Sequence, residues 1–388
     1  MATGPQSARG RRAAAVLALI AAGLLILTRS LPSARDAELP AIAIAQPSTP
    51  MPSPGRAQPP SAEDVPGETF EFSMEDLCAY AEYEAQAERF AFDWNKAAEE
   101  HESTLREVKG RLMISEDPEH LHTAALLEDD PTRSMELMAR AVSAGGDNPF
   151  HVWSAVRMCA ELHEETDCPL QAWQERMLEL DGQNSEAWIL AAAVRMEAGA
   201  EGAALDAMKR AAASSESRVY WPETIEMTDR AFAAASDLPF RDRVAQGADF
   251  ASLGLPNFAK YVTMCQEQSE QSQDWAYACL RYGEVSEREG KAVIGQRIAL
   301  VIQRVALKSL GDEARRRAAT ERYEQVQKAM NDALVDSHGT MMMVTSSPTL
   351  FSRYLASFRR VGEVETMASM HREAGRWARR HKDLECIP

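Results

Sequence analysis

Apolar side chains recur at helical spacing through most of the chain after residue 66. One helix face is outlined by Ile294, Ile298, Val301 and Val305, which follow the pattern i, i+4, i+7, i+11. Leu300 and Leu307 add a second apolar face, which predicts a helix packed between neighbours. No stretch alternates as a half-buried strand does, and β-branched residues are sparse beside Ala, Leu, Met, Glu, Gln and Arg. The pattern predicts an all-α fold.

Proline marks the starts of the predicted helices. A capping or turn residue precedes proline at Asp130-Pro131, Asn148-Pro149, Cys168-Pro169, Trp221-Pro222, Leu255-Pro256 and Ser347-Pro348. Proline is tolerated in a first helical turn because the N–H that it lacks has no helical partner there. The intervals predict helices of about 12–18 residues joined by short turns, which pack as stacked helical hairpins.

Residues 148–214 contain a weak internal repeat. Trp153 and Trp188 lie 35 residues apart, each a few residues after an asparagine, and residues 172–176 match 206–210 at an offset of 34. This period, with an early tryptophan in one helix and small residues in the next, resembles the tetratricopeptide repeat. The aligned positions are Trp188, Ala191, Ala204, Met208 and Ala211. Ala192 and Arg195 replace the family's glycine and tyrosine, and no closing proline follows. The resemblance implies an α-solenoid; an irregular helical bundle is the alternative.

The first 30 residues have the form of an export signal. Arg9, Arg11 and Arg12 precede the uncharged run 13–27, and Arg29 follows it. The basic end stays inside, so the bulk of the chain is predicted to cross the membrane. The run is short for a spanning helix, which needs about 17–25 residues, but flanking arginines can snorkel. We interpret residues 1–30 as a single-pass inner-membrane anchor with the bulk in the periplasm. A cleaved signal peptide, leaving a secreted or periplasmic protein, is the alternative.

Residues 31–66 are predicted to be a linker. They hold nine of the 19 prolines, a density that prevents helices and sheets and favours extended polyproline geometry. At about 3.1 Å per residue the linker would hold the domain on the order of 100 Å from the bilayer. A leader without any spacing role explains this composition equally well. Residues 67–388 then form the helical domain.

Six cysteines in an exported chain indicate disulfides. Cys159 and Cys168 flank one predicted turn between helices, and Cys265 and Cys279 flank another, so each pair is placed to join the two helices of a hairpin. Pairing of the remaining two, Cys78 and Cys386, would join the ends of the domain. Buried free thiols are the alternative in each case.

The charge of the chain bears on the kind of partner it takes. The formal net charge is −17, and residues 67–351 alone carry −22. An acidic surface repels phosphate backbones, so no nucleic-acid partner is expected.

The search for catalytic and metal-binding motifs identifies none. Residues 283–291 have the wrong spacing for a phosphate loop, and no CxxC, HExxH or GxSxG motif occurs. His120 and His122 are the nearest approach to a metal cluster, but side chains at i and i+2 on a helix point apart. The sequence thus assigns no catalytic residue, metal or cofactor.

Three functions remain open: a binding scaffold, an exported hydrolase and a purely structural component of the cell envelope. Trp153, Trp173 and Trp188 are candidates for a peptide-binding surface, because aromatic anchors dominate recognition; at helical spacing such residues more often belong to the core. The first hypothesis is a membrane-tethered or exported scaffold that binds a protein or peptide partner in the cell envelope. The alternative is an exported hydrolase whose site is assembled from dispersed residues.

Overall fold

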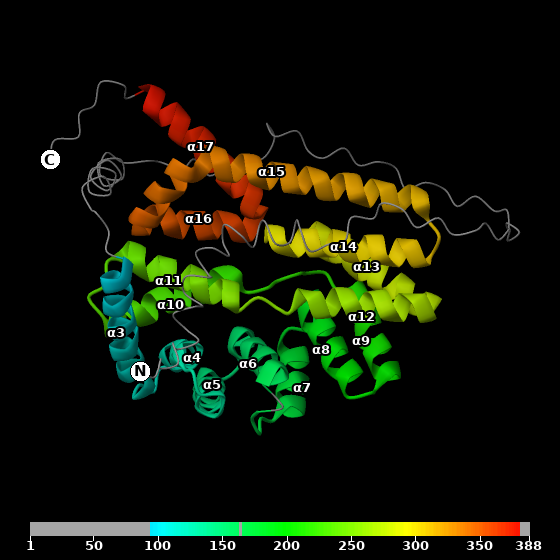
Figure 1. The fold of residues 1–388 in the computed structure, drawn as a ribbon, viewed down its shortest axis with the longest axis horizontal. Coiled ribbons are helices and arrows are strands. Elements are labelled where there is room, and N and C mark those ends of the chain that lie inside the picture. Colours follow the sequence, from blue (N-terminus) through cyan, green and yellow to red (C-terminus); the bar gives the residue numbers. More distant parts are fainter. Residues whose placement is uncertain (1–93, 163–164, 381–388) are drawn as a thin grey trace, which may run out of the picture. The chain divides into compact units, whose positions relative to one another are not determined.

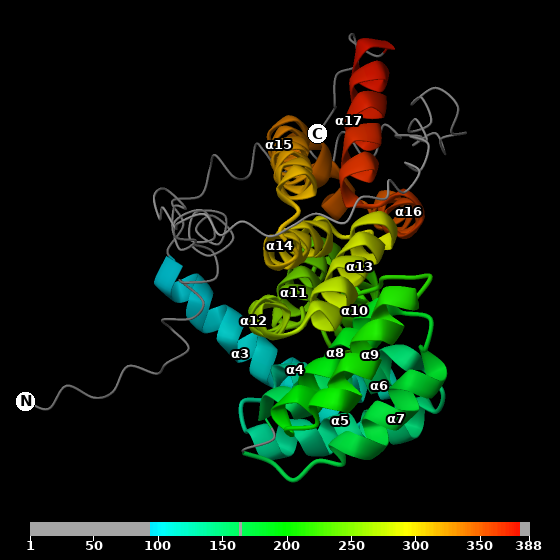
Figure 2. The same ribbon diagram turned by 90° about the vertical axis from the view of Figure 1, so that its right-hand side faces the viewer.

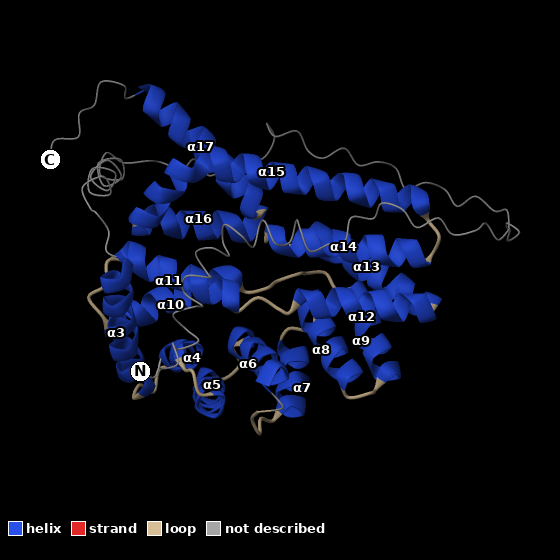
Figure 3. Ribbon diagram, in the orientation of Figure 1, coloured by secondary structure: helices blue, strands red, loops and turns tan. Residues whose placement is uncertain are grey.

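The computed structural model describes residues 94–162 and 165–380. These residues form the helices α3 (Trp94–Met113), α4 (Pro118–Leu127), α5 (Pro131–Gly145), α6 (Pro149–Leu162), α7 (Leu170–Leu180), α8 (Ser185–Glu197), α9 (Glu201–Ala213), α10 (Trp221–Ala235), α11 (Phe240–Leu253), α12 (Phe258–Gln271), α13 (Gln273–Glu289), α14 (Val293–Ser309), α15 (Glu313–Ser346), α16 (Pro348–Val361) and α17 (Glu363–Arg380) (Figure 1). Figure 3 shows helices and loops and no strand in this part of the chain. The prediction of an all-α fold is confirmed for these residues.

Helices that follow each other in the chain pack as pairs. The pairs are α4 with α5, α6 with α7, α8 with α9, α10 with α11, α12 with α13, and α14 with α15. Contacts of α9 with α13, and of α10 with α4, stack one pair on another. Figure 2 shows α9 and α13 side by side. This arrangement confirms stacked helical pairs. Membership of the tetratricopeptide class stays a prediction.

Proline does mark most of the predicted helix starts. Pro131, Pro149 and Pro348 are the first residues of their helices, and Pro222 is the second residue of α10. The reason is local, because a preceding polar side chain can accept the free N–H groups of the first turn. Asp130 does so for α5, accepting from the N–H of Arg133 at 3.0 Å.

Two of the predicted starts are displaced by a few residues. Pro169 is the N-cap of α7 rather than its first residue, and α12 begins only at Phe258. Asn257 lies between Pro256 and that helix, and it caps α12 by accepting the N–H of Lys260. Another start, Pro118 after the capping Asp117, was missed by the sequence analysis.

Small side chains allow α8 and α9 to approach closely. Ala191 and Ala192 on α8 and Ala204, Met208 and Ala211 on α9 are all fully buried. Alanine at a helix contact permits a short distance between helix axes, which increases dispersion contacts along both helices. The positions that suggested a repeat are therefore buried on two paired helices.

Helix α14 is buried on a different face from the one that its sequence emphasises. Leu300 and Leu307 are buried, as expected. The longer apolar row from Ile294 to Val305 is only half-buried. The deepest face also carries Gln303, whose amide donates to the carbonyl of Gly283 at 3.0 Å. A polar side chain with a buried partner was not recognisable as core from hydrophobicity alone.

Two disulfides join neighbouring helices. Cys159 on α6 pairs with Cys168 just before α7, and Cys265 on α12 pairs with Cys279 on α13. Both predicted pairs are confirmed, and they indicate an oxidising compartment. Cys78, Cys386 and residues 1–66 lie outside the described residues. Among the helices that are described, none has both the length and the hydropathy needed to cross a bilayer.

Removal of the Cys265–Cys279 bond is expected to lower the free energy of unfolding by about 3 kcal/mol, because the bond closes a loop of about 15 residues. Urea denaturation of Cys265→Ala/Cys279→Ala beside the parent chain measures this loss. Addition of a reductant should destabilise the parent more than the variant. An equal response of both chains would show that this bond does not contribute.

Candidate functional site

A cleft of about 250 Å³ opens where three helices meet two connecting segments. One wall is the connector between α9 and α10, residues 217–220, together with the start of α10. The opposite wall is the connector between α13 and α14, residues 290–292, with Gly295 of α14. Phe358 and Arg359 of α16 close one side. The volume is close to the lower end of the range for ligand-binding pockets.

The connector on the first wall is held extended by its neighbour, the turn between α7 and α8. The Glu216 N–H donates to the Gln183 carbonyl at 3.0 Å, and the Ser185 N–H donates to the Glu216 carbonyl at 2.8 Å. These two bonds make a parallel β-bridge between Asn184 and Glu216. Such a bridge orients the connector as if it were an edge strand.

The side chain of Asn184 extends this pairing by one more residue of the connector. Its Oδ1 accepts the Arg218 N–H at 2.8 Å, and its Nδ2 donates to the Arg218 carbonyl at 3.0 Å. The same side chain also accepts the N–H of Glu186, which caps α8, and donates to the carboxylate of Asp181. Asn184 is fully buried, with both ends of its amide bonded.

The other edge of the connector is unpaired. In extended backbone the amide groups of successive residues point to opposite sides, so Ser217 and Val219 face away from Asn184. The backbone N–H and C=O groups of these two residues have no hydrogen-bond partner among the described residues. Both residues line the cleft, and Ser217 is only 6% exposed. Backbone polar groups without a partner in the fold are open to water or to a ligand, and a binding edge uses such groups.

Tyr220 adds a strained backbone to the same wall. It is the only non-glycine residue with positive φ in the described part of the chain, with φ 55° and ψ 25°. A bulky side chain in this region costs about 1–3 kcal/mol. The conformation is held because the Tyr220 hydroxyl donates to Asp181 at 2.8 Å, while the ring packs beside Phe150 and Trp153. Strained residues of this kind cluster at functional sites.

The second wall is fixed by the C-terminal helices. The N–H of Glu363, the first residue of α17, donates to the Lys291 carbonyl at 2.9 Å. In return, the Glu363 carboxylate accepts the N–H of Val293 at 2.9 Å. Gly362, with φ 94°, lies so close that a Cβ atom there would be 3.2 Å from the Lys291 carbonyl oxygen. The turn between α16 and α17 therefore holds the connector in place.

The arginines at the rim are neutralised within the protein. Arg359 contacts Glu223 at 3.0 Å and Glu226 at 2.6 Å, which joins α16 to α10. Arg218 contacts the buried Asp181 at 2.9 Å and also the partly exposed Glu216. Charge-assisted pairs of this kind fix the shape of the rim more than they add to stability.

A buried carboxyl group lies behind the first wall. Glu186 is 1% exposed and accepts the hydroxyls of Ser217 at 2.9 Å, Tyr282 at 3.0 Å and Ser286 at 3.1 Å. Burial raises the pKa of the Glu186 carboxyl, and the hydroxyl donors oppose part of that rise. The Ser217 side chain is thus committed to the interior, while its backbone faces the cleft.

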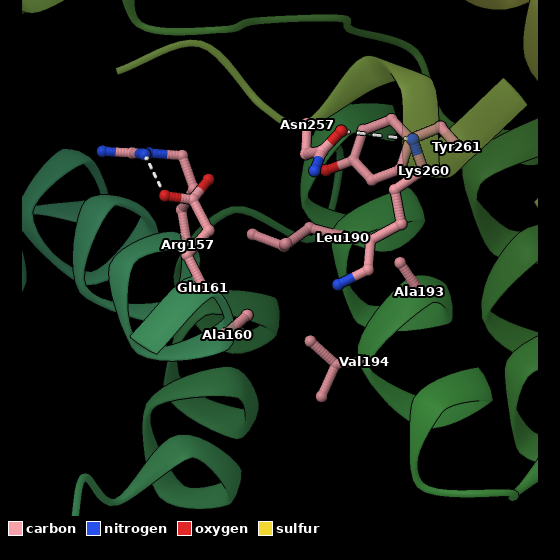
Figure 4. A pocket seen from close by; sticks show the side chains of 9 residues that line it. All are labelled: Arg157, Ala160, Glu161, Leu190, Ala193, Val194, Asn257, Lys260 and Tyr261. Atoms are coloured by element: carbon pink, nitrogen blue, oxygen red, sulfur yellow. Dashed lines mark hydrogen bonds and ion pairs between the residues drawn. The ribbon is translucent and has the colours of Figure 1, made fainter. Parts of the chain in front are cut away.

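A second hollow, between α6, α8 and α12, holds little more than one water molecule (Figure 4). Its volume is about 20 Å³, and its walls include Arg157 and Glu161 on one side and Lys260 on another. Arg157 donates to Glu161 at 3.0 Å. A space of this size does not admit an organic ligand.

The two histidines suggested by the sequence do not meet. His120 pairs with Ser115, whereas His122 is buried and its Nδ1 lies 2.9 Å from Nδ1 of the buried His151 on α6. One of these nitrogens donates and the other accepts, so the ring that accepts must be neutral in this bond. Burial lowers the pKa of both His122 and His151; neighbouring Glu119 and Asp117 oppose this for His151.

Two of the candidate tryptophans belong to the core. Trp153 is 2% exposed and Trp188 is 8% exposed, both within one buried cluster. Trp173 is partly buried and packs against the same cluster. Trp153 and Trp188 therefore face the core, and a binding role for the partly buried Trp173 stays a prediction. Trp153 still supports the cleft indirectly through its contact with Tyr220.

The cleft itself was missed by the sequence analysis. Its one sequence signal is the stretch 214–220, too polar and too long for a tight turn, followed by Trp221-Pro222. No protein-family model matches the chain, and comparisons with curated proteins and with solved structures found no match.

Asn184→Ala is expected to lower the free energy of unfolding by about 2–3 kcal/mol, because it removes a cap and leaves the backbone groups of Arg218 unpaired. Asn257→Ala is the matched control, since Asn257 is exposed and caps α12 without holding a connector. It should cost about 1 kcal/mol. Chemical denaturation of both variants measures the difference, and equal losses would contradict a clamping role.

The histidine pair should make stability fall in acid. The folded pKa values lie below the ordinary 6.5, so the unfolded chain binds protons first as the pH falls through that value. Between pH 7.5 and 5.5 the loss is expected to be about 1–3 kcal/mol. His122→Leu/His151→Leu should remove this part of the pH dependence, and exposed His371→Leu should not. The raised pKa of Glu186 acts with the opposite sign, so the readout is the difference between each variant and the parent.

Proposed function

We propose that the protein is a scaffold that binds a partner polypeptide in the cell envelope, and that the cleft beside residues 217–219 is its docking site. The unpaired backbone edge of Ser217 and Val219 is the observation that carries this proposal. An extended segment laid along such an edge gains main-chain hydrogen bonds, which is the β-augmentation mode of peptide recognition. The opposite wall, residues 290–292, is extended as well and limits the width of the bound segment.

The setting of the proposal comes from the sequence and the disulfides. Two disulfides are consistent with a periplasmic or extracellular domain. The basic and apolar start of the chain supports tethering to the inner membrane, with a cleaved signal as the alternative. We infer a tetratricopeptide-like arrangement for α6–α9, whose buried alanines support close stacking.

The rigidity of the cleft favours binding over a merely structural role for this surface. Asn184 fixes the first wall, and Glu363 fixes the second. A partner that docks on preformed edges loses little conformational freedom of the scaffold, and this reduces the entropic cost of association. For a hydrolase, the hydroxyls of the cleft would be those of Ser217 and Tyr220, and these are bonded to the buried Glu186 and Asp181.

Photocrosslinking in the cells that produce the protein tests the docking site. A benzophenone amino acid placed at position 223 lies in the cleft. The substitution removes one ion-pair partner of Arg359, which keeps its other partner, Glu226. We expect a covalent adduct with a defined polypeptide at position 223. No such adduct should form with the same group at Tyr277, which is 56% exposed outside the cleft.

The backbone edge is tested in the same assay. Val219→Pro removes an N–H that faces the cleft, and the preceding residue is already extended, as proline requires. The adduct at position 223 should fall about tenfold, in line with the loss of a hydrogen bond that leaves a partner group unpaired. Val219→Ala keeps the N–H and should preserve the adduct. Equal adduct yields in Val219→Pro and Val219→Ala, or equal crosslinking from positions 223 and 277, would contradict the proposal.

A further inference from the structure

Gly295 is a glycine that the fold does not require. It lies in the first turn of α14, it does not have a positive φ, and a Cβ atom built on it would meet nothing within 4 Å. Alanine in a helix is ordinarily more stable than glycine because it loses less backbone freedom on folding. The open space in front of Gly295 is the cleft. The missing side chain therefore keeps room for something that binds there.

Lys291 provides an uncompensated charge in the same wall. Of the charged side chains that line the cleft, Arg218, Arg359 and Glu223 form ion pairs within the described residues, and Lys291 does not. Its backbone is fixed by the bond from Glu363 to its carbonyl, so the position of its Cα atom is determined. The N–H of Val293 is already occupied by the Glu363 carboxylate, so the positive charge available to a ligand comes from Lys291.

We infer that the cleft binds an extended acidic segment of a partner polypeptide, with a ligand carboxylate on Lys291 and the ligand main chain passing over Gly295. This inference rests on the proposed docking site and adds the chemistry of its occupant. A carboxylate pairs with an ammonium group by a charge-assisted hydrogen bond, which is stronger than a neutral one.

The acidic charge of the domain makes a preference for acidic peptides a clear test of this inference. Residues 67–351 carry a net charge of −22, so nonspecific attraction selects basic peptides and rejects acidic ones. A preference for acidic peptides therefore has to come from a local contact that outweighs the field of the domain. Lys291 between two fixed extended segments is such a contact.

Three pools of 12-residue displayed peptides provide the probe: one with two fixed Asp or Glu residues, one with two fixed Lys or Arg residues, and one neutral. All share the same apolar positions. The immobilised full-length chain should enrich the acidic pool. Binding constants of the recovered peptides should weaken about tenfold in Lys291→Glu, as expected when one partner of a desolvated charge pair is reversed. Lys308→Glu, an exposed lysine at the other end of α14, makes the same change in net charge and should have no effect.

Gly295→Ala tests the open space at Gly295 separately from the charge of Lys291. It should raise the thermal midpoint of unfolding by about 1–2 °C, because the unfolded chain loses freedom. The same variant should weaken the binding of acidic peptides about tenfold, because the added methyl group fills the space that their main chain occupies. A variant that is more stable and binds as well as the parent would show that Gly295 has no role in binding.

The outcomes distinguish the two proposals. If no pool binds better to the parent than to Val219→Pro, the docking site itself is wrong. If peptides bind in a manner sensitive to Val219→Pro but the basic or neutral pool is enriched, or Lys291→Glu equals Lys308→Glu, the docking site stands and the acidic occupant is overturned.

Discussion

The hydrogen bonds of one buried amide hold the candidate site together. Asn184 caps α8 with the same oxygen that accepts the N–H of Arg218, and its nitrogen bonds Asp181 and the Arg218 carbonyl. A hydrophobic side chain at this position would leave the N–H of Glu186 and both backbone groups of Arg218 without these partners, which is more costly than the net gain of any single bond. Through this amide, the turn that follows the pair α6–α7 determines the path of the backbone that leaves the pair α8–α9.

The cleft exists because connectors, rather than helices, form two of its walls. Helices satisfy their own backbone groups and leave no edge, so a helical stack offers partners only side chains. Extended connectors between stacked pairs expose main-chain groups, provided that something prevents them from collapsing into turns. Here that support is Asn184 on one side and Glu363 on the other, and the strained Tyr220 turns the chain into α10 at the point where the edge ends.

The fold class, the hairpin pairing and both disulfides could be predicted because each depends on local pattern. Period 3.6, proline after a capping residue, and cysteines on either side of a turn all act over fewer than about 20 residues. The cleft could not be predicted, because its parts come from residues near 184, 218, 291 and 363, which only the packing brings together. The sequence left the place of Trp153 and Trp188 open, since periodicity puts them on helices without saying which face is turned inward. His122 found its partner 29 positions away in the chain.

The bond between Lys291 and the turn at Gly362 has a consequence for how the protein is made. A polypeptide is synthesised from its N-terminus, and its domains fold as their parts become available. The walls at residues 217–220 and 290–292 precede α16 and α17 in the chain, yet the bonds between the second wall and Glu363 form only after those helices have docked. A chain truncated ahead of residue 347 keeps both connectors and the bonds of Ser217 and Gln296, but it lacks the Glu363 bonds and the side of the cleft that Phe358 and Arg359 form. The cleft is therefore complete only when the C-terminal helices are present.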